Sequence, residues 1–272
     1  MQFVDMAFAR RLESCEEIPQ VEYAQVFQKT RPEIGAAVEE ISGGHMVFAG
    51  LGSPIGRVTG AGLDRPLTAA DLDRIEEFYR SHGAPAQVDL CPMHGPEIFE
   101  MFKERGYAIA EFNNVLYRKL EATEFHFVAP EGCEIRRAYF EEAETTGAIV
   151  QNAFFPDGAP EAFRGLIAPL YQMEGGLAFV ATVEGKPVAC GTGVVISQHR
   201  MFALCGAGTL AAYRGRGLQT ALLIARMQAA GKAGCEYAAV VTQGGTTSQR
   251  NVERLGFRVA YSKATVIRKL SS

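Results

Sequence analysis

The spacing of apolar residues changes along the chain, and each regular stretch predicts an element. In residues 1–45 apolar positions recur at helical spacing, which predicts helix up to the glycine pair at 43–44. The same spacing predicts helices at 72–79, 97–104, 140–153, 160–171 and 221–233. Short apolar runs bounded by turn residues predict strands at 46–51, 86–90, 105–120, 133–137, 177–183, 188–196, 201–205 and 238–241. Strands and helices alternate in this order, so the pattern predicts an α/β (α+β) fold with a mixed sheet.

A gap-free internal similarity relates the two halves of the chain. Residues 105–120 align on residues 255–270, a constant offset of 150 residues that runs from 120 to 270. The identical positions are Gly106 and Gly256, Ala110 and Ala260, and the Arg-Lys-Leu endings that begin at Arg118 and Arg268. The alternative is a chance likeness of two common strand endings. The repeat predicts two domains, residues 1–120 and 133–272, joined by a polar linker at 121–132.

Composition narrows the class of protein. Of 272 residues, 47% are hydrophobic and 21% are charged, which is typical of a globular protein with a sizeable core. The net charge of −4 argues against a nucleic-acid partner or an acidic membrane surface. No run reaches eighteen apolar residues and the first residues lack the pattern of a secretory signal. We therefore expect a cytoplasmic protein, either a monomer or a homodimer.

The cysteines and histidines predict no metal site. Six cysteines are scattered along the chain without a CxxC pair or a nearby pair of histidines. Most lie in apolar surroundings, which favours reduced thiols in the core. Cys205 alternates within an apolar strand and is interpreted as a core residue rather than a nucleophile. His94, in the sequence CPMHG, has no visible partner and is interpreted as a turn residue.

A strand, a glycine-rich cationic loop and a helix follow one another between residues 199 and 233. The loop contains Arg214, Gly215, Arg216 and Gly217. Glycines allow close approach of a ligand to the backbone, and the first N–H groups of a helix point outward at the positive end of its dipole. The stretch therefore predicts a phosphate or pyrophosphate site. The alternative is a surface turn with two solvated arginines.

A dinucleotide fingerprint overlaps this stretch. Residues 206–211 satisfy GxGxxG/A after a strand, which taken alone is a weak signal. The cationic loop interrupts the expected helix, and no acid lies between Gly208 and Glu236 to hold a ribose. A P-loop is also missing. A nicotinamide-dependent oxidoreductase is therefore the weaker interpretation, and binding of NAD(P)H would reveal it.

The loop and a later segment together resemble one enzyme family. Arg214-Gly-Arg-Gly-Leu-Gln219 is similar to the Arg/Gln-x-x-Gly-x-Gly/Ala pyrophosphate loop of the GNAT superfamily of acetyl-coenzyme A-dependent acyltransferases. Residues 248–257 resemble the last helix of that family and its Leu-Gly-Phe ending. Gln219 departs from the pattern and leaves less room for close backbone approach. The resemblance implies two GNAT-like units, each with a central mixed sheet flanked by helices.

At the offset of 150 residues the cationic loop aligns with Asp64-Arg-Pro-Leu67. The first half therefore has no glycine at these positions. Asp64 would repel an anion, and Pro66 lacks the N–H group that could bind one. The sequence thus resembles the tandem members of the superfamily in which one half is degenerate, and only the second half is expected to bind the cofactor.

The resemblance implies a set of cofactor-binding residues. The loop and the first turn of the helix should present backbone N–H groups to the pyrophosphate, while the end of the preceding strand should pair with the pantetheine arm. Ser248 and Asn251 are candidates for polar contact with the arm, although an ordinary solvent-facing role for Asn251 is equally open. The full cofactor set is Thr209, Leu210, Ala211, Arg214, Gly215, Arg216, Gly217, Leu218, Gln219, Thr220, Ser248 and Asn251.

The catalytic residues stay unknown at this point. Many GNAT enzymes carry a tyrosine five residues before the final phenylalanine, where this chain has Val252. No Asp or Glu lies on the strand 201–207 to act as a base. A water chain, a residue from the other half or unassisted departure of the thiolate are the alternatives. For the acceptor, Phe154, Asp157 and Tyr171 are weak candidates, and a core role is equally open.

The implied function is transfer of an acetyl group from acetyl-coenzyme A to a primary amine of a small molecule or amino acid. The alternative class is a non-catalytic acyl-coenzyme A-binding or sensory module, which the missing tyrosine and carboxylate favour.

Overall fold

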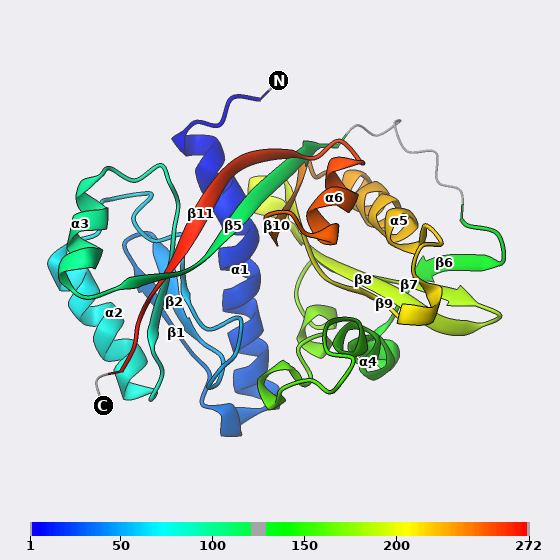
Figure 1. Ribbon diagram of the computed structural model, residues 1–272, viewed down its shortest axis with the longest axis horizontal. Coiled ribbons are helices and arrows are strands. Elements are labelled where there is room, and N and C mark those ends of the chain that lie inside the picture. Colours follow the sequence, from blue (N-terminus) through cyan, green and yellow to red (C-terminus); the bar gives the residue numbers. More distant parts are fainter. Residues whose placement is uncertain (1, 121–128, 271–272) are drawn as a thin grey trace. The chain divides into compact units, whose positions relative to one another are not determined.

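The computed structural model describes residues 2–120 and 129–270. The chain forms two compact units (Figure 1). Unit 1 comprises Met1–Leu116, Val241–Thr246 and Val259–Ser272, and unit 2 comprises Tyr117–Val240 and Thr247–Arg258. Of the predicted linker 121–132, residues 121–128 lie outside the described part of the chain. No helix in the described ranges has the length and hydropathy needed to cross a membrane.

Unit 1 has its strands in the order β1-β2-β3-β4-β11. Its elements are α1 (Met6–Thr30), η1 (Pro32–Ile34), β1 (Ala37–Ile41), β2 (Gly44–Phe48), β3 (Val58–Thr59), α2 (Ala69–Ser81), β4 (Ala86–Leu90), α3 (Glu97–Glu104), most of β5 (Ala108–Lys119) and most of β11 (Arg258–Arg268). The β3–β4 pair is parallel, and the other neighbouring pairs are antiparallel. The unit is therefore built on a mixed sheet, as the sequence pattern predicts.

The helix predicted to run through residues 1–45 ends early, and that part of the prediction is wrong. Helix α1 stops at Thr30, one residue before Arg31, which precedes a proline and is therefore disfavoured in helical geometry. Residues 37–48 form the hairpin β1–β2 instead. Ser42 and Gly43 both have positive φ angles, 49° and 78°, which is the geometry of a tight hairpin turn. The turn residues outweigh the apparent helical spacing.

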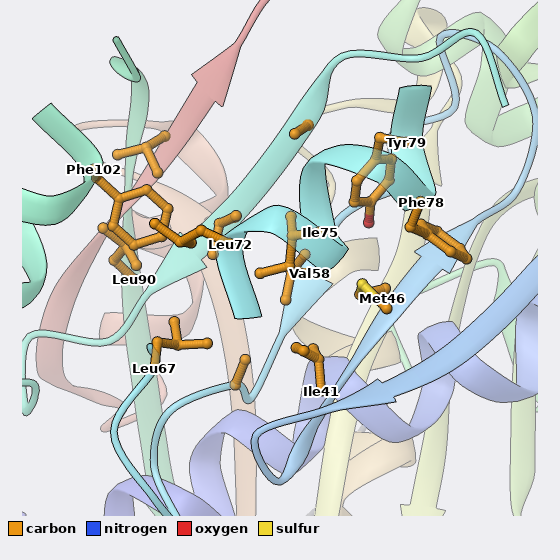
Figure 2. Close-up of a cluster of buried hydrophobic side chains, with 14 of the residues drawn as sticks. Ile41, Met46, Val58, Leu67, Leu72, Ile75, Phe78, Tyr79, Leu90 and Phe102 are labelled. Carbon is orange, nitrogen blue, oxygen red and sulfur yellow. The ribbon is translucent and has the colours of Figure 1, made fainter. Parts of the chain in front are cut away.

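One face of the unit 1 sheet carries an apolar core. Leu72, Ile75 and Phe78 of α2 pack on the strands, and Val58 and Met46 lie beneath them (Figure 2). All five side chains are at most 5% exposed. Since successive side chains of a strand point to opposite faces, alternate residues of the strands supply this core and the residues between them face α1.

The other face of this sheet, toward α1, is charged. Lys263 of β11 is 1% exposed, and its Nζ lies 3.1 Å from Oε2 of Glu13 and 3.4 Å from Oδ2 of Asp89. It also pairs with Glu16. Burial favours the neutral form of Lys263, yet the surrounding carboxylates raise its pKa. Burial also raises the pKa of Glu16. A single buried ammonium group thus offsets the charge of several carboxylates.

Unit 2 has strands in the order β10-β9-β8-β7-β6. Its elements are β6 (Cys133–Arg137), η2 (Phe140–Glu142), α4 (Ala143–Phe154), η3 (Glu161–Phe163), η4 (Ala168–Tyr171), β7 (Gly176–Val183), β8 (Lys186–Ile196), η5 (Ser197–His199), β9 (Met201–Thr209), η6 (Ala211–Tyr213), α5 (Leu218–Lys232), part of β10 (Tyr237–Gln243) and α6 (Thr247–Glu253). Strands β6 to β9 form an antiparallel meander, and β10 pairs with β9 in parallel. Figure 1 shows α4 and α5 on opposite sides of β7, β8 and β9.

The helix predicted at 160–171 is replaced by two short turns, η3 and η4. The prediction is wrong because the backbone cannot propagate a helix there. Gly165 has a φ of 73°, in the left-handed region, and Pro169 has no N–H group to donate. The segment therefore reaches β7 as a loop with two isolated turns.

The same order of elements occurs twice along the chain. β3-α2-β4-α3-β5 in the first half corresponds to β9-α5-β10-α6-β11 in the second, with β5 beginning at 108 and β11 at 258. The final strand of the second half, however, does not stay with that half. β11 pairs with β4 of unit 1, whereas the end of β5 belongs to unit 2, where the N–H of Leu120 donates to the Glu236 carbonyl at 2.8 Å. The compact units therefore differ from the continuous domains expected from the sequence.

Replacement of Lys263 by Met should lower the free energy of unfolding by about 3–5 kcal/mol, because three carboxylates lose the buried cation that they share. Urea denaturation at pH 7 measures the change. The matched control is Lys269→Met, the same substitution at an exposed position six residues later. Equal stability of the two variants would contradict the role assigned to Lys263.

Candidate functional site

The start of α5 is the most distinctive feature of unit 2. Gly217 is the N-cap with a φ of 78°, and within the described ranges no side chain caps this 15-residue helix. Gly215 also has a positive φ, 76°. Residues 214–217 are exposed. The first N–H groups of α5 are therefore available at the positive end of the helix dipole, as an anion site requires.

The side chains of the loop hold it against the strand that precedes it. Arg214 donates from Nε to the Thr209 carbonyl at 3.2 Å and from Nη2 to the Ala153 carbonyl at 2.9 Å. Gln219 donates to Oγ1 of Thr209 at 2.8 Å. The guanidinium of Arg216 lies over the Tyr213 ring, 5.7 Å from its centroid. The hydrogen bonds of Arg214 and Gln219 thus fix the conformation of the loop. Arg216 is an exposed cation beside the start of the helix.

The corresponding helix start in unit 1 is closed by its own side chains. Thr68 and Asp71 form a capping box at the start of α2, in which Asp71 accepts from the Thr68 N–H at 2.9 Å. Both terminal nitrogens of Arg65 donate hydrogen bonds to the Asp71 carboxylate, at 2.7 and 2.8 Å. These Arg65 hydrogen bonds lower the pKa of Asp71 well below its usual range. A carboxylate therefore already occupies the position that an anion takes at a free helix start.

The edge of β9 that faces β10 is only partly paired. Within the described residues, β10 pairs with β9 from Met201 to Ala203. β9 continues to Thr209, so residues 204–209 extend beyond this pairing. Backbone groups along an unpaired edge are available to an added extended chain.

On its other edge, β9 has a bulge that sequence reasoning did not identify. Thr192 of β8 pairs with Cys205 and Gly191 pairs with Ala207, which leaves Gly206 as the extra residue. Gly206 has a φ of 46°, and a Cβ there would lie 2.5 Å from Oγ1 of Thr192. The available signal was a glycine interrupting an apolar strand.

Helix α6 carries the last of the candidate cofactor residues. Ser248 is exposed near its start, and Asn251 is half-buried one turn later. Val252 is 3% exposed, and its carbonyl accepts from the Phe257 N–H at 3.2 Å. An apolar, buried side chain at this position can donate no proton.

The three acceptor candidates lie in different environments. Phe154 is 66% exposed at the end of α4, and Asp157 is exposed in the following turn. Tyr171 instead packs against a small core cluster and shares a hydrogen bond of 2.8 Å with Oγ1 of Thr146. Burial raises the pKa of Tyr171 to about 12. Tyr171 therefore has a structural environment, whereas Phe154 and Asp157 are accessible.

Burial shifts the pKa of both Cys205 and His94, and for Cys205 the shift disfavours the reactive form. Burial raises the pKa of the Cys205 thiol, whose sulfur lies 3.6 Å from Oγ1 of Thr192. Burial also lowers the pKa of His94. A thiol that is disfavoured as a thiolate is a poor nucleophile.

Comparison with known proteins finds one family model that matches part of the chain. Residues 133–257, just under half of the chain, match the model of the acetyltransferase (GNAT) family. A search of curated proteins gives no match.

Solved structures extend the likeness to most of the chain. A GCN5-related N-acetyltransferase from Kribbella flavida is 20% identical with a TM-score of 0.65, over 91% of this chain and 96% of that one. A tandem GNAT protein from the clavulanic acid biosynthesis pathway is 12% identical with a TM-score of 0.62, over 87% and 80% of the two chains. At these identities the likeness is one of fold, a mixed sheet flanked by helices.

Replacement of Asp71 by Ala should lower the free energy of unfolding by about 1–2 kcal/mol at pH 7, because α2 loses its capping box and Arg65 loses its partner. The pKa of Asp71 is lower in the folded than in the unfolded chain. Its contribution is therefore complete above about pH 4 and declines as the pH falls below that value.

Urea titrations of wild type and variant at pH 7 and pH 2.5 measure this dependence. Asp73→Ala serves as the control, since Asp73 lies on the same helix and pairs with Arg105 while being 70% exposed. A wild-type advantage that stays constant between the two pH values would contradict the prediction.

Proposed function

We propose that this chain transfers an acetyl group from acetyl-coenzyme A to a primary amine of a small molecule or amino acid, since residues 133–257 match the model of the acetyltransferase (GNAT) family. The observation that carries the proposal is the uncapped start of α5 next to the partly paired edge of β9. One feature suits a pyrophosphate and the other an extended amide-containing arm. The two occur together at one end of β9.

The residues present fit the coenzyme. Backbone N–H groups of residues 215–220 would hold the pyrophosphate, with Arg216 adding a charge-assisted contact. Thr209, Leu210 and Ala211 would pair with the arm, and Ser248 and Asn251 remain candidates for polar contacts. The bound coenzyme supplies the thioester that carries the acetyl group. The chain's part is to bind and orient it, and the loop contacts of Arg214 and Gln219 keep the helix start open.

The proposal confines coenzyme binding to unit 2. The capping box and Arg65 already fill the start of α2, and Asp64 adds a second carboxylate there, 3.3 Å from Arg10. A pyrophosphate would have to displace Asp71 from Arg65. The first half is thus proposed to be degenerate in binding.

Calorimetric titration with acetyl-coenzyme A should give one site per chain. Gly217→Asp should weaken binding by about 100-fold or more, because a carboxylate would stand at the helix start that holds the pyrophosphate. Gly185→Asp is the matched control. Gly185 has a φ of 75° in the β7–β8 turn, close to the 78° of Gly217. A Cβ added to Gly185 would meet no other atom within 4 Å, so there is room for the new side chain. Equal affinities of the two variants, or no binding by wild type, would remove the assignment.

A second candidate function is a non-catalytic acyl-coenzyme A-binding module. The observation that favours it is Val252, which is buried and apolar where many members of the family place a proton-donating tyrosine. The described residues of β9 likewise include no carboxylate. Both candidates require the same coenzyme site and differ only in turnover.

A thiol-release assay over a panel of primary amines separates the two candidates. The transferase should release coenzyme A with at least one amine, at a rate that rises with pH as the amine loses its proton. Gly217→Asp should abolish that release, whereas Gly185→Asp should retain it. Tight binding of acetyl-coenzyme A without release on any amine would favour the binding module.

A further inference from the structure

A buried arginine on α5 has no carboxylate partner among the described residues. Arg226 is 1% exposed, and its guanidinium donates only to backbone carbonyl oxygens. The distances are 3.1 Å from Nε to Leu222, 2.8 Å from Nη1 to Thr192 and 3.4 Å from Nη1 to Cys205. Burial lowers the pKa of Arg226 to about 10, which still leaves it charged at neutral pH. Burial of a cation costs desolvation free energy, so a hydrophobic residue of similar size would stabilise the core at least as well if packing were its only role.

The two carbonyls from different strands belong to the β8–β9 bulge. Thr192 and Cys205 are paired at the step where the register shifts past Gly206. A bulge disrupts the ladder and leaves backbone groups that need other partners. Arg226 supplies such a partner to both strands.

Arg226 and the Thr192 hydroxyl reach this bulge from opposite faces of the sheet. Thr192 donates its hydroxyl to the Cys205 carbonyl at 3.0 Å. A Cβ on the neighbouring Gly191 would lie 2.6 Å from Cζ of Arg226, so glycine makes room for the guanidinium. Because successive residues of a strand point to opposite faces, Gly191 faces α5 and Thr192 faces the other side. The Cys205 carbonyl is held from both sides.

The bulge lies where the acyl end of the coenzyme should arrive. The partly paired edge of β9 runs from residue 204 to Thr209, next to the start of α5. An arm that pairs with Thr209 and follows the strand back passes three residues before it reaches Gly206. At a strand rise of about 3.3 Å per residue this is a path of roughly 10 Å.

We propose that Arg226 is a positioning residue which, through the Cys205 carbonyl, orients and polarises the N–H of Gly206 as the donor to the acetyl carbonyl of bound acetyl-coenzyme A. The Cys205 carbonyl and the Gly206 N–H belong to one peptide group. A cation that accepts electron density at the oxygen makes the N–H of the same group a stronger donor. The inference rests on the proposed function and adds a residue that does not touch the coenzyme itself.

The test compares two ligands that differ in the acetyl group. Arg226→Met should weaken the binding of acetyl-coenzyme A by up to about tenfold, which is the effect of losing one good hydrogen bond. Its affinity for coenzyme A should stay within about twofold of that of the wild type. Arg226→Lys keeps the charge on a shorter side chain and should give an intermediate loss for the acetylated ligand. The matched control is Met227→Leu, at the adjacent α5 residue that is 0% exposed, which should change neither affinity.

A second readout uses the protein without coenzyme. In a chain labelled with [15N]glycine, the Gly206 amide proton should move upfield in Arg226→Met, less in Arg226→Lys and not in Met227→Leu. If Arg226→Met does not fold, Arg226→Lys carries both readouts.

The outcomes separate this proposal from the one on which it rests. Failure of wild type to bind either ligand overturns both. Normal wild-type binding with equal losses for the two ligands in Arg226→Met or Arg226→Lys overturns the role of Arg226 alone. So does an unchanged Gly206 resonance. A selective loss for the acetylated ligand, accompanied by the shift of Gly206, supports it.

Discussion

The first backbone N–H groups of a helix cannot be satisfied within the helix, and the two units resolve this constraint in opposite ways. In unit 1 the side chains of Thr68 and Asp71 turn back on the start of α2, and Arg65 fixes the carboxylate in place. In unit 2 the same position of the repeat carries glycines, and no described side chain caps α5. One helix start is thereby capped by its own side chains, and the other leaves its first N–H groups without a described side-chain cap. The asymmetry of the molecule follows from this difference.

Strand β9, which precedes the start of α5, is irregular on both of its edges. On the β10 side, pairing ends at Ala203 and leaves backbone groups for an extended arm. On the β8 side, Gly206 is an extra residue that interrupts the ladder. At this interruption Thr192 donates its hydroxyl to the Cys205 carbonyl, and Arg226 donates to the Thr192 carbonyl. Irregular backbone at the site is thus stabilised by buried polar groups that a regular strand would not need.

The pairing of β11 with β4 has a physical basis in the charged residues of α1. At the offset of the repeat, Lys263 of β11 corresponds to Asn113 of β5. Only the lysine can offset the charge of Glu13, Glu16 and Asp89. A neutral amide at this position would leave Glu13 and Glu16 without the cation that they share, which costs several kcal/mol, whereas Asp89 would keep Arg57 at 3.3 Å. The two strands look alike in hydrophobic pattern, and a single charge distinguishes the partner of β4.

The sequence by itself determined the elements around the loop, the repeat and the resemblance to a family. The elements depend on residues close together in the sequence, for which local spacing and turn chemistry are sufficient. The repeat and the resemblance depend only on comparing whole segments of sequence. Only the tertiary structure decided that β11 belongs beside β4, that residues 37–48 form a hairpin, and that Arg226 supports the bulge. Lys263 and Glu13 are 250 residues apart in sequence. Whether a charge is exposed or buried depends on the partner that folding brings to it, and local pattern carries no information about that partner.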